Sequence, residues 1–260
     1  MDEEAVILGK ALIDSWRKDD ILQITMTPEE GDLLRQSYEI SKAFFELPHA
    51  EKSKYVDDQS YAGYIASGEE ITDGIADYSE IFTVFKDLPA TDTRVRDKWP
   101  CHGPCPWPSP EYEHVMKQLM GLLGQSGRKL LKLVGLGLGL KDPDALVHLT
   151  KDGWHHMHVL RFPQVDRTNG NDKAGRGIGS HTDYGLLVIA SQTDVGGLFV
   201  RPPVHGEDNI ENWEKSAAGL HEDDDKWIFV PPVENTLTVF PGSRSLYPEI
   251  RSRRVNLWHR

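Results

Sequence analysis

A histidine and an aspartate two residues apart, His181 and Asp183, are the residues of this 260-residue chain whose types and spacing point most directly to chemistry. Residues i and i+2 of a β-strand project to the same face, so these two side chains can reach one ion while Thr182 points away. An imidazole nitrogen and a carboxylate oxygen are two of the three ligands in the 2-His-1-carboxylate site of non-haem iron proteins, which leaves positions open for an oxidant and a co-substrate. The motif therefore predicts an Fe(II) centre at the end of a strand.

The composition limits the class of protein that can hold this motif. With 38% hydrophobic and 27% charged residues, the chain can bury a core as one large domain or two small ones. The net charge of −12, with no basic stripe, argues against nucleic acid or anionic membrane as a partner. We find no signal peptide and no apolar run that would span a bilayer, and we therefore expect a cytoplasmic protein. Cys101 and Cys105 are expected to be free thiols in a loop.

Helix signals come first along the chain, and strand signals follow. Helices are predicted over residues 6–16, from the capping box Thr27-Pro28-Glu29-Glu30 to residue 47, over 109–135 and over 142–150. Strands are predicted at residues 21–24, 157–162, 185–190, 197–201, 227–230 and 236–240, with a charged, solvated loop at 207–226. Helices packed around short, evenly spaced strands predict an α+β protein. Its core would be a double-stranded β-helix, the cupin-like jelly roll, with N-terminal and flanking helices.

Several segments together resemble one family of enzymes. They are residues 61–72, 80–87, 99–104, 152–157, 159–163, 176–190 and 195–198. These segments are similar to the microbial 2-oxoglutarate-dependent ethylene-forming enzymes, within the isopenicillin N synthase-like branch of Fe(II)/2-oxoglutarate dioxygenases. The resemblance implies Fe(II), with 2-oxoglutarate and O2 as co-substrates. It also implies conversion of 2-oxoglutarate to ethylene and CO2, coupled to hydroxylation of L-arginine with succinate as coproduct.

The resemblance implies a role for each matched residue. His181 and Asp183 match the metal ligands, and no catalytic residue beyond them is expected. The positions that match contacts to the arginine substrate are Glu70, Ile71, Thr72 and Tyr184. A carboxylate such as Glu70 suits bidentate recognition of a guanidinium. Phe162 and Leu198 match apolar walls of the 2-oxoglutarate pocket, although buried strand residues of any jelly roll would give the same pattern.

A histidine cluster, His155, His156 and His158, lies just before the predicted iron motif. By strand alternation His156 and His158 share a face, and His156 is expected to point toward the barrel interior. A metal site of their own would lack a nearby carboxylate, so we expect them to support the structure or to contact the metal ligands. The matching position of the bacterial enzyme holds an arginine where this chain has His158. That difference leaves the balance between ethylene formation and hydroxylation open.

The tail departs from the family pattern. Residues 243–260 contain five arginines, no lysine and one glutamate, a net of +4 in a chain of net −12. We expect this tail to lack the last barrel strands, the distal histidine ligand and the arginine that anchors 2-oxoglutarate. His205, His221 and His259 are weak candidates for the third ligand. A site with two ligands should hold Fe(II) weakly, so we expect little oxygenase activity from the chain as it stands.

The predicted organisation has three parts. They are a mostly helical region with the substrate loop (1–150), a partial oxygenase jelly roll (151–242) and a divergent tail (243–260). Three functions stay open: an ethylene-forming oxygenase acting on arginine, a related oxygenase that hydroxylates another small metabolite, and an inactive remnant that binds a small molecule or a partner. The sequence does not determine the oligomeric state.

Overall fold

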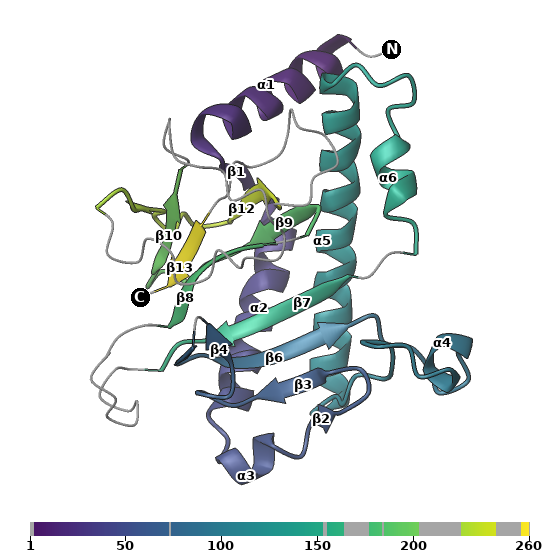
Figure 1. The fold of residues 1–260 in the computed structure, drawn as a ribbon, viewed down its shortest axis with the longest axis vertical. Coiled ribbons are helices and arrows are strands. Elements are labelled where there is room, and N and C mark those ends of the chain that lie inside the picture. The colour runs from purple at the N-terminus through teal and green to yellow at the C-terminus, as the bar shows by residue number, and fades with distance from the viewer. Residues whose placement is uncertain are drawn as a thin grey trace. The chain divides into compact units, whose positions relative to one another are not determined.

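The computed structural model describes residues 3–72, 74–152, 155–163, 177–183, 185–202 and 225–242, and the backbone of 256–259. These residues form two compact units that interleave in the sequence. Unit 1 comprises Met1–Gly31, Leu123–Lys151 and Ile178–Arg260, and unit 2 comprises Asp32–Leu122 and Asp152–Gly177. Two long helices, α2 (Pro28–Phe45) and α5 (Pro110–Gly137), contribute residues to both units (Figure 1). The three predicted sequence segments and the two compact units therefore divide the chain differently.

Unit 1 contains two antiparallel sheets. Its elements are α1 (Glu3–Asp19), β1 (Leu22–Thr25), α6 (Ala145–Leu149), β8 (Ile178–Thr182), β9 (Leu187–Ala190), β10 (Leu198–Arg201), β11 (Ile228–Phe229), β12 (Thr236–Pro241) and β13 (Asn256–His259). One sheet has the order β1-β12-β9 and the other the order β11-β10-β13-β8. Buried Leu198 and Val200 of β10 pack in one cluster with Phe240 of β12 and Val188 of β9. The two sheets thus bury a common apolar layer, as a jelly roll requires.

The tail supplies a strand that the sequence did not predict. Strand β13 runs antiparallel between β10 and β8 and pairs Leu257 with His181. Without it, β8 and β10 would each present a row of unpaired backbone groups. The expectation that the tail leaves this sheet without its closing strand is therefore corrected. The sequence of β13, Asn-Leu-Trp-His, stands in an arginine-rich tail without the flanking turn residues that marked the predicted strands.

Helix α1 packs closely against the end of α5 at a pair of glycines. A Cβ added to Gly9 would lie 2.2 Å from the carbonyl oxygen of Leu133, and one added to Gly137 would lie 2.4 Å from the carbonyl carbon of Gly9. Only glycine, which carries a hydrogen in place of Cβ, therefore fits at positions 9 and 137. The indole nitrogen of Trp16 donates to the backbone oxygen of Val239 at 3.1 Å and so joins α1 to β12. The predicted first helix is confirmed, and it extends beyond both predicted ends.

Unit 2 contains a sheet of the order β2-β3-β6-β7 and the hairpin β4-β5. Its elements are α3 (His49–Lys52), β2 (Val56–Asp57), β3 (Ala62–Ile65), β4 (Ile71–Thr72), β5 (Ile75–Ala76), β6 (Glu80–Phe85), α4 (Thr93–Arg96) and β7 (His156–Arg161). The sequence predicted mainly helices before residue 150, so strands β2 to β6 are an addition. Most of them are too short to alternate, and β6 is buried at every position, which removes the polar side of the pattern.

Aromatic residues of α2 and α5 cover the sheet of unit 2. Phe44 of α2 and Tyr112 of α5 pack edge-on against Phe82 of β6, with ring centroids 5.1 and 5.0 Å apart. Phe82 and Met116 are completely buried. Each such aromatic pair contributes about 0.5–1.5 kcal/mol beyond its buried area. This layer fixes β6, and β6 pairs with β7 along six residues.

Local capping signals were read correctly from the sequence. Thr27 Oγ1 accepts from the Glu30 backbone N–H at 3.3 Å, and Glu30 Oε2 accepts from the Thr27 N–H at 2.8 Å, which is a capping box. Ser109 Oγ accepts from the backbone N–H of Tyr112 at 3.1 Å at the start of α5. Helix α5 ends two residues later than predicted, just before Gly139 with its positive φ of 68°. In the part of the chain that the structure describes, no helix has the length and apolar character needed to cross a bilayer.

Candidate metal centre and substrate hairpin

His181 and Asp183 converge at the end of β8, as predicted. His181 Nε2 lies 3.7 Å from Asp183 Oδ1, and the two side chains are 28% and 32% exposed. Because the backbone oxygen of Gly179, 2.9 Å from His181 Nδ1, can only accept, Nδ1 carries the ring proton and Nε2 presents its lone pair. Donor atoms at this separation can both reach one ion at bond lengths of about 2.1 Å. The pair therefore fits two ligand positions of a metal site.

The turn that follows Asp183 is held by the end of β12. A Cβ added to Gly242 would lie 1.9 Å from the backbone oxygen of Gly185, so no other residue fits at 242 without moving this turn. The backbone N–H of Gly242 also donates to the Leu186 oxygen at 3.3 Å. Packing at a glycine thus fixes the segment that follows the candidate ligand Asp183.

The third ligand is not among the side chains that the structure describes. Within that part of the chain, no group of three or more His, Cys, Asp or Glu side chains could hold a metal ion. The register of β8 and β13 pairs Leu257 with His181, and pairs His259 with Ile178. Ile178 lies three residues before His181, which is roughly 10 Å along the strand. His205 and His221 lie outside the described residues.

The predicted arginine-binding residues lie on the hairpin β4-β5 of unit 2. Ile71 is 68% exposed, and Glu70 and Thr72 are half-buried. The hairpin closes on Asp77, whose backbone N–H donates to the Glu70 oxygen at 2.9 Å and whose oxygen accepts from the Gly68 N–H at 2.8 Å. Thr72 Oγ1 donates to Asp77 Oδ2. Sequence reasoning missed Asp77, whose one local signal is its place just after a turn. Tyr184 lies outside the described residues.

A buried ionic network joins β3 and β6, the strands that come before and after this hairpin in the sequence. Glu80, at the start of β6, accepts from Lys52 Nζ, from the Tyr64 hydroxyl at 2.5 Å and from Arg161 Nη1 of β7 at 2.7 Å. Glu80 and Lys52 are 8% and 4% exposed. Burial opposes ionisation of Glu80, but the hydrogen bonds from Lys52 and Tyr64 outweigh it and lower the pKa of the carboxyl group. Burial and the Glu80 carboxylate raise the pKa of Tyr64. No sequence pattern indicated this network.

The histidine pair lies on β7, and the two proposed pocket walls belong to different units of the chain. His156 and His158 share a face of β7, as alternation predicted, with ring centroids 4.9 Å apart. Both are exposed, so the interior position expected for His156 is not found. Phe162 follows β7 and is half-buried, whereas Leu198 is 2% exposed in the core of unit 1.

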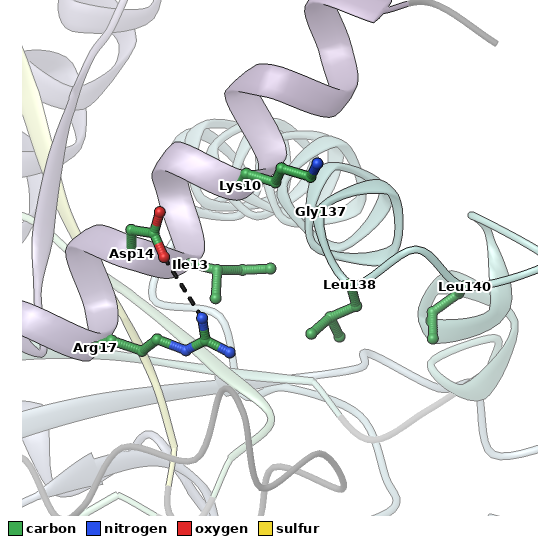
Figure 2. A pocket seen from close by; sticks show the side chains of 7 residues that line it. All are labelled: Lys10, Ile13, Asp14, Arg17, Gly137, Leu138 and Leu140. Atoms are coloured by element: carbon green, nitrogen blue, oxygen red, sulfur yellow. Dashed lines mark hydrogen bonds and ion pairs between the residues drawn. The ribbon is translucent and has the colours of Figure 1, made fainter.

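A separate cavity of about 490 Å³ lies in unit 1 between α1 and the turn that follows α5 (Figure 2). Its lining residues are Lys10, Ile13, Asp14, Arg17, Gly137, Leu138 and Leu140. The exposed Asp14 and Arg17 form an ion pair at 3.5 Å on its rim. None of the predicted site residues lines this cavity.

Comparison with solved structures supports the fold. A full-length Neurospora crassa protein, solved in complex with alpha-KG and 5-formyluracil, matches with a TM-score of 0.73 at 19% identity, and the match covers 99% of this chain and 74% of that protein. A putative 2OG-Fe(II) oxygenase family protein from Caulobacter crescentus matches with the same TM-score and identity, over 100% of this chain and 77% of its own. At 19% identity these two structures show what the fold is, and the sequence comparison identifies the family.

Sequence comparison gives the family. Residues 2–110 match a family model described as the non-haem dioxygenase in morphine synthesis N-terminal region. The 2-oxoglutarate-dependent ethylene/succinate-forming enzyme of Ralstonia nicotianae is 51% identical over 237 residues, which are 90% of this chain and 68% of that enzyme. The Arabidopsis thaliana homoarginine-6-hydroxylase 2-ODD-C23.1 is 30% identical over 63% of this chain and 50% of its own length. The chain belongs to the 2-oxoglutarate-dependent oxygenase family, in the branch of the ethylene/succinate-forming enzyme.

This chain is shorter than its relatives. It spans about two thirds of the Ralstonia enzyme and half of the Arabidopsis hydroxylase.

Proposed function

We propose that this chain is an Fe(II)- and 2-oxoglutarate-dependent oxygenase of the ethylene- and succinate-forming type. The observation that carries this proposal is the pair at the end of β8, with His181 Nε2 and Asp183 Oδ1 3.7 Å apart and Nδ1 engaged by Gly179. The Ralstonia relative at 51% identity supports it. Fe(II), when bound, supplies the centre at which O2 and 2-oxoglutarate react. The products would be ethylene and CO2, with succinate from a coupled hydroxylation.

The residues of the chain hold the metal and shape its surroundings. His181 and Asp183 bind Fe(II), and the hydrogen bond to Gly179 keeps the imidazole in the tautomer that a metal requires. The resemblance assigns apolar walls of the 2-oxoglutarate pocket to Leu198, which is almost fully buried, and to Phe162, which is half-buried. Walls of this kind keep water from the reacting groups.

The substrate of the coupled hydroxylation is a guanidino amino acid, with L-arginine as the first choice. Glu70 lies at the base of the β4-β5 hairpin, and its carboxylate can accept two hydrogen bonds from one guanidinium. Thr72 and the neighbouring Ile71 complete this contact surface, and the resemblance assigns a further contact to Tyr184. The similarity to a homoarginine-6-hydroxylase favours the same chemical class, since homoarginine also carries a guanidinium.

A related oxygenase that acts on another small metabolite is the second candidate. His158 stands where an arginine is expected, and it is exposed on β7 beside His156. Histidine is shorter than arginine and titrates near neutrality, so it does not provide a fixed positive charge. The difference at position 158 is expected to change which substrate the site prefers. It is also expected to change the ratio of ethylene formation to hydroxylation.

Binding of Fe(II) is expected to be weak, because the described side chains offer no group of three candidate ligands. Leu257 is the residue that pairs with His181 in the sheet. A histidine at this position would stand across from His181 on the same face of the sheet. We therefore expect Leu257→His to strengthen Fe(II) binding and to raise turnover.

The test is Fe(II)- and 2-oxoglutarate-dependent formation of succinate and ethylene by the purified chain and by Leu257→His. Turnover is expected to be slow, to rise in Leu257→His and to be abolished by Asp183→Ala in either background. His148→Ala is the matched control, because His148 is an exposed histidine of unit 1 that pairs at the surface with Asp142. Turnover that survives Asp183→Ala would exclude the proposed centre.

A further inference from the structure

The β4-β5 hairpin presents hydrogen-bond acceptors. Thr72 Oγ1 donates its proton to Asp77 Oδ2. A hydroxyl group has one proton and two lone pairs, so a threonine whose proton is engaged by a carboxylate meets a ligand only as an acceptor. The ionised carboxylate of Glu70 is also an acceptor and cannot donate. Glu70 and Thr72 therefore both favour a ligand group that is rich in N–H donors.

Asp77 is held in a position from which it can accept the Thr72 hydroxyl proton. It is 1% exposed, and its backbone is tied on both sides, by its N–H to Glu70 O at 2.9 Å and by its oxygen to Gly68 N–H at 2.8 Å. The same backbone bonds hold the base of the hairpin closed. With its backbone held by these bonds and its side chain buried, Asp77 keeps its carboxylate against the Thr72 hydroxyl.

We propose that Asp77 is a positioning residue that sets substrate specificity: by engaging the Thr72 hydroxyl proton, it makes the hairpin select a guanidinium over a neutral ureido group of the same shape. A guanidinium offers donors only. A ureido group replaces one of them with an oxygen, which would face the lone pairs of Thr72 without a proton between them. This inference rests on the proposed function, because it concerns the substrate site assigned there.

The test compares binding of L-arginine and L-citrulline to the full chain by equilibrium dialysis. Citrulline differs from arginine by the ureido oxygen in place of one guanidinium nitrogen. Asp77→Asn keeps the size of the side chain but can donate an N–H to Thr72 Oγ1, which frees the hydroxyl proton for a ligand. We expect the wild-type chain to prefer arginine, and the ratio of the two affinities to fall about tenfold in Asp77→Asn, the effect of one hydrogen bond to a charged group.

Two further variants separate specificity from structure. Thr72→Ser keeps the hydroxyl and should keep the wild-type preference. Asp87→Asn replaces a half-buried aspartate of unit 2 that lies away from the hairpin and accepts from the Cys105 N–H at 2.8 Å. This variant should also leave the ratio unchanged.

The possible failures are distinct. Equal loss of affinity for both ligands in Asp77→Asn would show a structural role only and would overturn the inference. An unchanged ratio in Asp77→Asn would do the same. If the wild-type chain binds arginine no better than citrulline, and Glu70→Gln changes neither, the proposed substrate class itself fails.

Discussion

Replacing Glu80 by glutamine is the sharpest test of how unit 2 holds its substrate hairpin and β7. The variant keeps the size of the side chain and removes its negative charge. Lys52 then loses its carboxylate partner while it stays 4% exposed, and the Phe45 oxygen, 3.0 Å from Lys52 Nζ, remains as an acceptor. Arg161 also loses a partner, but its side chain is 34% exposed and water can replace part of the loss.

The expected magnitude follows from this burial. Removing one member of a buried ion pair costs about 3–5 kcal/mol, because an uncompensated charge is left behind. With a denaturant slope of about 2–3 kcal/mol per molar urea, a loss of about 3 kcal/mol lowers the unfolding midpoint by about 1 M or more. The transition is measured by tryptophan fluorescence and by circular dichroism in urea.

A matched surface variant gives the control. Glu51→Gln breaks the pair between Glu51 and Lys54, 2.6 Å apart, whose side chains are 51% and 60% exposed. Such a pair contributes about 0–1 kcal/mol, so the midpoint should hardly move. If Glu80→Gln shifts the midpoint no more than Glu51→Gln does, the buried network does not stabilise unit 2. A partial recovery in the double variant Lys52→Met/Glu80→Gln would confirm that the stranded charge is the cause.

Three further outcomes are expected. The pKa values of Glu80 and Asp87 are lowered in the folded state, so ionisation of these two carboxyl groups stabilises the fold above their ordinary pKa values of 4.5 and 3.8. This stabilisation is lost as the pH falls through the lower pKa values of the folded state. Urea midpoints should therefore drop on acidification below about pH 4.5. Gly242→Ala should reduce Fe(II) binding as well as stability, because the added carbon meets the Gly185 oxygen at 1.9 Å; binding unchanged in a folded variant would show that this turn does not position Asp183. Deleting residues 256–260 should speed hydrogen exchange of the backbone amides in β8 and β10, and unchanged protection would contradict the pairing of β13.

Features that depend on residues close together in the sequence could be predicted. The His181 and Asp183 pair depends on strand alternation over three residues, and the Thr27 capping box on hydrogen bonds over four, so both were visible in the sequence and both are found. Helices α1, α2, α5 and α6 and most later strands were recognised for the same reason, since their periodicity lies within one segment, whereas the four-residue helices α3 and α4 were not predicted.

Long-range features could not be predicted in this way. Lys52, Glu80 and Arg161 are far apart in the sequence. Glu80 and Arg161 meet through the β6-β7 pairing, and Lys52 reaches Glu80 from α3. Asp77 gains its importance from a hydrogen bond to Thr72 that no spacing rule indicates. Strand β13 fills the gap between β8 and β10 and pairs with the backbone groups of both edges. The composition of the tail did not indicate this strand.

Anaerobic binding of Fe(II) and 2-oxoglutarate tests the proposed centre most directly. A bidentate 2-oxo acid on Fe(II) gives a visible charge-transfer absorption, and this signal requires no turnover. We expect the purified chain to develop the absorption when both are added, and His181→Ala and Asp183→Ala to lose it while His148→Ala keeps it. Absorption of equal strength in Asp183→Ala, or its absence from the wild-type chain at saturating Fe(II) and 2-oxoglutarate, would contradict the assignment of His181 and Asp183 as metal ligands.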